Sequence, residues 1–257
     1  MRNLSRSADR SSEPIVVQAA TGRVRTGGRT IAMQGREREF VVALALQAGP
    51  VPGAALGLLL NPDWTEPNAA NNAKVYVHRL RATVASDFVV RRDGGYVFGP
   101  RVRIDVVEGR ELLDRLSRSR ITVAQQEREP MIELARQLRS DAPHALRERE
   151  WFDTAAIGLR RLGHDLAMLI ARDALANGDV RDALAVAREL TYEEPCDEEA
   201  WELFIRALML LGEHPAAVQG YRFYEASLAK ELQARPSAHL RRLLGEAAYG
   251  GAHAVAV

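Results

Sequence analysis

The chain has 257 residues, of which 47% are hydrophobic and 27% are charged, so two ordinary domains can each bury a core. No apolar run reaches the roughly 18 residues that suggest a membrane-spanning helix, and the polar first residues lack the apolar region of a secretory signal. The single cysteine, Cys196, excludes an internal disulfide and cannot form a zinc site alone. We therefore expect a cytoplasmic protein without a membrane partner.

The net charge of +1 hides an uneven distribution. Residues 1–104 hold 15 Lys and Arg against 8 Asp and Glu, a net charge of +7; of the chain's 35 basic and 34 acidic residues, 20 and 26 remain for the rest, a net charge of −6. A basic N-terminal part joined to an acidic C-terminal part is typical of a DNA-binding domain fused to a protein-binding one. Charge alone does not distinguish this from chance segregation in an arginine-rich chain.

The N-terminal part begins with a polar tail and short strands. We expect disorder over residues 1–13 and strands over 15–20 and 29–33, each bounded by glycine-containing turns. The period then changes to that of a helix, which ends at Gly49-Pro50, and a second short helix is predicted over 54–60.

A third helix and a hairpin complete this part. The helix is predicted from about residue 67 to 84, because Ala73, Val77, Leu80 and Val84 repeat at helical spacing. Two apolar runs then flank Asp93-Gly94-Gly95, which is a strong hairpin signal. The predicted order is strands, three helices and a hairpin.

Beyond residue 106 the pattern is helical. We expect helices over 107–118, 122–139, 144–176, 180–191, 197–211, 214–232 and 237–247. One internal repeat relates Gly178–Leu184 to Gly212–Val218 at an offset of 34 residues, which is the tetratricopeptide period. A helical bundle with coincidental glycines is the alternative.

The third predicted helix and the hairpin carry the functional pattern. The helix face opposite the apolar positions holds Asn71, Asn72, Lys74, Tyr76, His78, Arg79 and Arg81. A helix fits the major groove, where Asn can pair with adenine and Arg with guanine. Arg91 and Arg92 of the hairpin can reach the DNA backbone or the minor groove, while Gly94 and Gly95 allow a tight turn and a close approach. A solvated amphipathic helix is the alternative, with Asn71 as a helix cap.

These motifs also resemble a known family. Residues 15–100 resemble the OmpR-type winged helix of bacterial response regulators: the helix string 75–81, VYVHRLR, stands at that family's recognition helix, and 92–96, RDGGY, at its wing. The resemblance implies base-facing roles for Asn71, Asn72, Lys74 and His78. It implies phosphate contacts for Trp64, Tyr76, Arg79, Arg81 and a wing arginine.

The chain departs from that family in three places. The family often has an arginine near Asn71, so the preferred target sequence is open to change here. Tyr76 replaces a common histidine, which leaves that contact open. The second helix lacks the acidic residues usual on a surface that often meets RNA polymerase, which leaves direct polymerase contact open.

Residues from about 105 to 247 resemble the bacterial transcriptional activator domain, a tetratricopeptide-like fold. The landmarks are Glu148-Arg149-Glu150-Trp151, Ala183-Leu184, Pro195, Trp201 and Glu231–Pro236. Together the two parts look like the antibiotic-regulatory, SARP-type activators.

The predicted fold is mainly α: an N-terminal α+β winged helix-turn-helix over 14–104, an all-α tetratricopeptide-like domain over 105–247, and a tail over 248–257. We expect a sequence-specific regulator of double-stranded DNA, an activator, whose helical domain forms a homodimer or binds a protein or effector. We expect no enzymatic activity, no cofactor and no metal, because the sequence contains no phosphate-binding loop, nucleophile elbow or paired histidine motif. The alternative is a protein-interaction adaptor whose winged helix no longer binds DNA.

Overall fold

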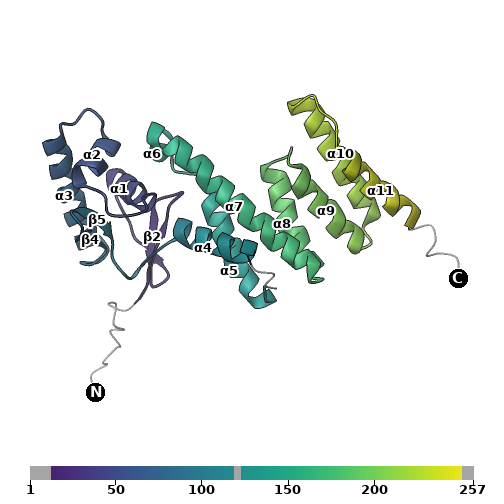
Figure 1. Cartoon of the computed structure of the whole chain (residues 1–257), viewed down its shortest axis with the longest axis horizontal. Helices are drawn as coiled ribbons and strands as arrows, with labels where there is room; N and C mark the ends of the chain where they lie inside the picture. Colours follow the sequence, from purple (N-terminus) through teal and green to yellow (C-terminus); the bar gives the residue numbers. More distant parts are fainter. Residues whose placement is uncertain (1–12, 119–122, 251–257) are drawn as a thin grey trace, which may run out of the picture. The chain divides into compact units, whose positions relative to one another are not determined.

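The computed structural model describes residues 13–118 and 123–250 and divides the chain into two compact units (Figure 1). The first contains the chain up to Leu112 together with Arg136–Gly163, and the second contains Leu113–Ala135 together with the chain from His164 onward. The predicted tails lie mostly outside the described residues. The first unit combines helices from both sides of residue 104, so the predicted domain boundary is not where these compact units divide.

A small sheet starts the first unit. Its strands are β1 Ile15–Gln18, β2 Arg23–Thr26, β3 Arg29–Thr30 and β6 Val102–Ile104, in the spatial order β3-β2-β1-β6. β1 pairs antiparallel with β2 and parallel with β6. β2 and β6 were not predicted, because β2 holds a single apolar residue and β6 spans only three residues. Tertiary pairing therefore decides both strands.

Three helices and a hairpin follow in the predicted order: α1 Gly35–Ala45, α2 Gly53–Leu60, α3 Glu66–Thr83, β4 Val89–Arg92 and β5 Gly95–Phe98. α1 begins where the carboxylate of Glu37 accepts a 3.2 Å hydrogen bond from the Gln34 backbone N–H. The hairpin turns at Asp93 and Gly94, whose φ angles are 46° and 78°, as the Asp-Gly sequence predicts for a two-residue turn.

Helices make up the rest of the chain: α4 Asp105–Arg118, α5 Gln125–Arg139, α6 His144–Arg147, α7 Glu150–Ala176, α8 Val180–Glu193, α9 Glu198–Leu210, α10 His214–Glu231 and α11 Ala238–Gly250. The mainly helical fold predicted from the sequence is confirmed. One predicted helix, 144–176, is instead two, because the chain leaves the helix between Arg147 and Glu150.

The turns α7–α8 and α9–α10 are the two copies of the repeat. Gly178 and Gly212 have φ angles of 82° and 77°. The N–H of the next residue, Asp179 or Glu213, donates a 2.9 Å hydrogen bond to the carbonyl of Ala174 or Leu208 respectively. This backbone pattern is the Schellman helix ending, which favours glycine. Equivalent hydrogen bonds at an offset of 34 residues support the tetratricopeptide-like interpretation of this region.

A buried arginine fastens α5 within the second unit. The Arg128 side chain is 2% exposed, and its Nη1 lies 2.8 Å from Asp179 Oδ2 and 3.1 Å from Asp182 Oδ2. Its Nη2 lies 3.7 Å from Asp173 Oδ2 and donates a 3.0 Å hydrogen bond to the Val123 carbonyl. We refer to Arg128 and its three aspartates as the Arg128 cluster.

Candidate nucleic-acid interface

α2 and α3 form a tightly packed helix-turn-helix. A Cβ atom at Gly57 of α2 would lie 2.3 Å from the Ala69 carbonyl oxygen of α3, so only glycine allows this approach. Between the helices, Asn61 Oδ1 accepts a 3.1 Å hydrogen bond from the Asp63 N–H. α3 then begins after Thr65 with Pro67 in its first turn, a position where the missing N–H costs nothing.

Four residues of α3 face the core. Ala69, Ala73, Val77 and Leu80 are at most 3% exposed. Successive residues turn by about 100° around a helix axis, so this buried stripe determines which side chains lie opposite. α3 therefore presents one defined outer face, and the position of each predicted DNA contact relative to that face can be assigned.

The centre of the outer face is Asn71, Val75 and His78. All three are exposed and lie nearly opposite the buried stripe by helical geometry. Lys74, also exposed, lies beside them, and its Nζ is 3.5 Å from Asn71 Oδ1. The structure thus brings together three of the four residues predicted to face bases.

Asn72 lies on the flank of this face. It is half-buried, and its Nδ2 donates a 2.9 Å hydrogen bond to the Asn68 carbonyl of the preceding turn. Arg79 lies on the same flank and is exposed. Asn72 is therefore less available than Asn71 in this conformation, a difference that the shared residue type does not reveal.

Three residues predicted to hold phosphates also have contacts inside the fold. Arg81 is half-buried, and its Nε donates a 2.7 Å hydrogen bond to the Val89 carbonyl of β4. The Tyr76 ring is half-buried, with its centroid 5.9 Å from that of Phe40 in α1. Trp64, in the turn before α3, is half-buried as well. The contacts of Arg81 and Tyr76 therefore help to hold α3 in place.

The hairpin presents two free basic side chains. Arg91 and Arg92 are exposed, and Gly94 at the turn has open space where a Cβ would point. Gly95 differs, because a Cβ there would lie 2.6 Å from the Val51 backbone nitrogen, where a β-bridge joins Val51 to Tyr96. Gly95 thus permits a close approach by the chain's own backbone, which was not predicted.

Val75 is a candidate that the sequence reasoning missed. It is 45% exposed and lies between Asn71 and His78. Its residue type alone would have suggested a buried position. The available signal was its spacing, four residues after Asn71 and three before His78, off the apolar stripe. An exposed apolar group on a helix face can contact a thymine methyl group.

A buried carboxylate anchors this helix-turn-helix. The Glu39 side chain of α1 is 4% exposed, and its Oε2 lies 2.9 Å from Arg36 Nη1 and 3.0 Å from Arg149 Nε. Arg149 Nη2 adds a 3.2 Å hydrogen bond to Glu39 Oε1. Arg36 Nη1 also donates a 3.1 Å hydrogen bond to the Leu60 carbonyl at the end of α2. This Glu39 cluster (Arg36, Glu39 and Arg149) therefore joins α1, α2 and the segment preceding α7.

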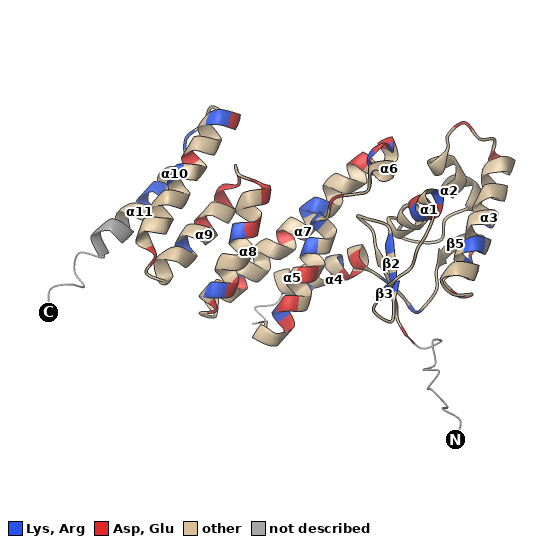
Figure 2. Cartoon of the chain, turned by 180° about the vertical axis from the view of Figure 1, so that it is seen from behind, with Lys and Arg blue, Asp and Glu red and all other residues tan. Residues whose placement is uncertain are grey.

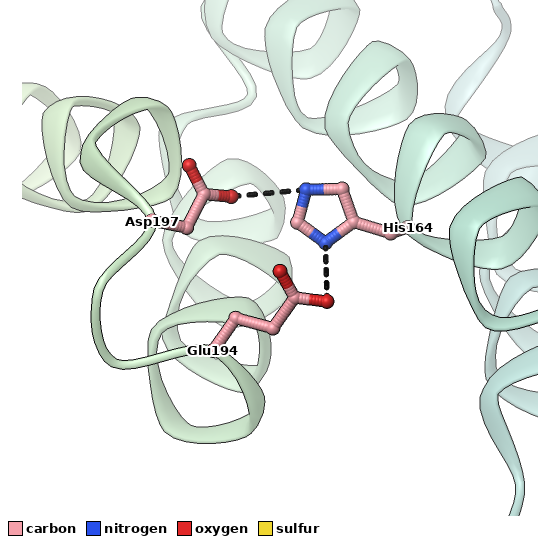
Figure 3. A group of neighbouring side chains, drawn as sticks. All are labelled: His164, Glu194 and Asp197. Carbon is pink, nitrogen blue, oxygen red and sulfur yellow. Dashed lines mark ion pairs between the residues drawn. The ribbon is translucent and has the colours of Figure 1, made fainter. Parts of the chain in front are cut away.

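Among the described residues, His164, Glu194 and Asp197 of the second unit form a candidate metal site (Figure 3). His164 Nε2 lies 2.9 Å from Asp197 Oδ2, whereas Nδ1 lies 3.7 Å from Glu194 Oε1. The two carboxylates thus lie near different nitrogens of the His164 ring. In a metal site, all ligands would surround an ion bound to one of these nitrogens. The hydrogen bond with Asp197 raises the pKa of His164, so the arrangement suits a doubly paired imidazolium better than a metal ion.

The two units differ in the charge that they display. Figure 2 shows basic residues on α3 and β2, and acidic residues around the α8–α9 turn. That turn region contains Glu193, Glu194, Asp197, Glu198 and Glu199. None of the helices among the described residues is long and apolar enough to cross a membrane.

Comparison with known proteins adds one family and one fold. The family model of the bacterial transcriptional activator domain matches residues 105–246, which is more than half of the chain. No curated protein matches. Among solved structures, Mycobacterium tuberculosis EmbR in complex with a low-affinity phosphopeptide is 21% identical with a TM-score of 0.59, and the match covers 93% of this chain and 65% of that one. At this identity the likeness indicates a shared fold.

Proposed function

Because the chain belongs to the family of the bacterial transcriptional activator domain, we propose that it is a sequence-specific DNA-binding regulator, an activator of SARP type. α3 enters the major groove of double-stranded DNA, and the β4–β5 hairpin lies beside it as the wing of an OmpR-type domain. The observation that carries the proposal is the outer face of α3, where polar and apolar groups lie opposite a buried stripe.

Base reading belongs to the centre of that face. Asn71 can donate to and accept from adenine N6 and N7, Val75 can contact a thymine methyl, and Lys74 can donate to guanine. His78 supplies a further donor or acceptor one turn along the helix. Asn72 can contact a base only after its hydrogen bond to the Asn68 carbonyl is broken. We therefore expect Asn72 to contribute less to base reading than Asn71.

Backbone contacts surround the reading face. Exposed Arg79, Arg91 and Arg92 are placed to neutralise phosphates. Trp64, Tyr76 and Arg81 contact phosphates only with their outer atoms, since all three side chains are half-buried. The basic excess in residues 1–104 supports this assignment, because phosphate neutralisation provides most of the non-specific affinity.

The helical domain provides regulation in this proposal. Stacked helix pairs hold peptides or other subunits, so a homodimer, a protein partner or an effector is expected there. α2 carries no charged residue. A contact between α2 and RNA polymerase would therefore be apolar; otherwise RNA polymerase contacts another surface of the chain.

A binding-site selection with the full chain tests the proposal. We expect an enriched sequence motif, which Asn71→Ala changes at particular base pairs by about 1–3 kcal/mol. Asn177→Ala, at the exposed end of α7, is the matched control and leaves the motif unchanged. Affinity should also fall by on the order of 10³ between about 50 and 200 mM salt if roughly six phosphates are neutralised.

Two outcomes contradict the proposal. A chain that neither enriches a motif nor is retained on random DNA would instead be the protein-interaction adaptor. A motif that is the same for Asn71→Ala and the parent would mean that another face of α3, or another element, reads the bases.

A further inference from the structure

A cavity of about 450 Å³ opens in the first compact unit between the segment just after α1 and the helices α2, α4 and α7. Its walls combine apolar and polar surface in similar amounts, and the apolar residues include Leu59 of α2, Val106 of α4 and Leu159 of α7. Val106 and Leu159 are 2% and 3% exposed, so the cavity borders a packed core. Small-molecule sites typically measure about 300–1,000 Å³ and have mainly apolar walls. The cavity is therefore of the size that holds a small ligand, with a more polar lining than is typical.

A glycine forms part of the cavity wall. Gly158 lines it and lies in the interior of α7, where glycine costs about 1 kcal/mol relative to alanine. A Cβ atom at Gly158 would meet no atom within 4 Å. By contrast, a Cβ at Gly220 of α10 would lie 3.0 Å from the Phe204 ring, which explains that glycine by packing. Gly158 is exposed and no described neighbour requires glycine there, so a larger residue can be placed at this position of the wall without a clash.

The polar groups of the cavity favour an anion. Arg110 is the one charged side chain that lines it, and the polar side chains of Gln47 and Thr154 accompany it. Arg110 is exposed and forms no ion pair with the described residues. Trp151 also lines the cavity, and its buried Nε1–H has no acceptor in the structure. A buried donor gains from an oxygen atom brought by a ligand.

We propose that this cavity binds a small amphipathic organic anion. The apolar body of the ligand contacts the leucine and valine walls beside Gly158, and its anionic group pairs with the Arg110 guanidinium. The inference deepens the proposed function, since it gives a place and a chemical class to the effector of the regulator. Its position between the helix-turn-helix and the activator-domain helices of the same unit suits that role.

Two fluorescent probes with the same rings test the proposal. Anilinonaphthalene sulfonate carries an anionic group, and N-phenylnaphthylamine lacks it. We expect the full chain to bind both, and the sulfonate more tightly. Arg110→Gln should weaken only the sulfonate, by about fivefold to tenfold, because the guanidinium is at the solvent-exposed rim. The titration contains no DNA, so its failure is distinguishable from failure of DNA binding.

Filling the cavity provides the decisive variant. Gly158→Phe places a ring in the open space and should weaken both probes by at least about tenfold, since it removes most of the apolar contact area. Gly245→Phe is the matched control, because Gly245 of α11 also has open space at its Cβ position but lies outside the cavity. Thermal melting shows whether each variant is folded.

The proposal is overturned by either of two results. If a folded Gly158→Phe protein binds both probes as the parent does, they bind elsewhere on the surface. If Arg110→Gln leaves the sulfonate affinity unchanged, the cavity does not select an anion. Loss in Gly158→Phe, retention in Gly245→Phe and selective weakening in Arg110→Gln together support it.

Discussion

Each of the two compact units contains an ion cluster around a buried central group, and the central groups of the two clusters are opposite in sign. In the Glu39 cluster a single carboxylate, 4% exposed, meets two arginines. In the Arg128 cluster a single guanidinium, 2% exposed, meets three aspartates. The surplus charge of the cluster is positive in the unit that holds α3 and negative in the one that holds the repeat turns. The same physics therefore holds the helix-turn-helix in place in one unit and fastens α5 beside the repeat helices in the other.

This difference has a physical consequence. Removal of the central group leaves partners of one sign close together, and an uncompensated buried charge is costly. Removal of Arg128 leaves three aspartates, 20%, 32% and 36% exposed, that repel one another. Removal of Glu39 leaves only two arginines, 44% and 29% exposed, and their long side chains can turn toward water. We therefore expect the Arg128 cluster to be the more sensitive of the two.

Arg128→Met should produce the largest effect. It leaves three aspartates without their common cation and should lower the free energy of unfolding by about 3–5 kcal/mol, mainly in the second unit. Chemical denaturation followed by circular dichroism measures the change. Arg172→Ala, which breaks the exposed pair with Glu199, is the control and should cost less than about 1 kcal/mol. Equal effects would show that burial is not what makes Arg128 important.

Glu39→Gln should have a smaller effect on stability and a specific one on DNA binding. We expect a loss of about 2–3 kcal/mol of unfolding free energy, below the full value for a buried pair because both arginines are partly solvated. Arg36 then loses the partner that directs it toward Leu60 at the end of α2. DNA affinity, measured well below the melting temperature, should fall by about threefold to tenfold, or roughly 1 kcal/mol.

The control for this variant is Asp114→Asn, which removes an exposed ion pair of α4 with Arg118. It should alter neither stability nor DNA affinity appreciably. If Glu39→Gln were as stable as the parent, or bound DNA equally well, the Glu39 cluster would not position the helix-turn-helix.

His164 should make stability depend on pH in the second unit. The hydrogen bond with Asp197 raises the His164 pKa above its ordinary value of 6.5, outweighing the effect of burial, and Glu194 adds attraction. The folded state thus holds the proton more tightly than the unfolded state. The stabilisation, on the order of 1 kcal/mol, is fully present below about pH 6.5 and disappears as pH rises through the folded pKa.

Denaturation midpoints of the parent and His164→Gln across this pH range test the prediction. The difference between them should shrink as the pH rises. A difference that stays constant would mean that His164 contributes by packing alone. A difference that grows with pH would show that the neutral ring is the one that the structure prefers.

Alanine variants of Arg81 and Arg92 should distinguish a contribution to the stability of the fold from a contribution to DNA binding. Arg92→Ala removes an exposed wing cation, so it should change stability by less than about 0.5 kcal/mol and reduce the salt slope of DNA binding by about one unit. Arg81→Ala also removes the bond to the Val89 carbonyl and should cost about 1–2 kcal/mol of stability. If both variants were equally stable, the α3–β4 bond would be dispensable.

Much of the architecture could be predicted from local patterns. Glycine at the α7–α8 and α9–α10 turns, the Asp93-Gly94 hairpin turn and the apolar stripe of α3 each encode structure within a few residues, because helix endings, tight turns and amphipathic faces depend on neighbours in sequence. The outer face of α3 was predictable for the same reason, since helical spacing alone opposes Asn71 and His78 to the stripe.

What the tertiary structure decided depends on partners far apart in the chain. Strand β6 forms because it pairs in parallel with β1, which lies 87 residues earlier in the chain (Ile15 opposite Val102). A strand of three residues has too short a hydrophobic pattern to be predicted from the sequence. Arg81 turns toward Val89, Gly95 faces Val51, and Glu39 meets Arg149 across 110 residues. Residue type shows that such side chains can form ion pairs or close contacts, but only folding brings the partner within reach, since the interactions act over a few ångströms.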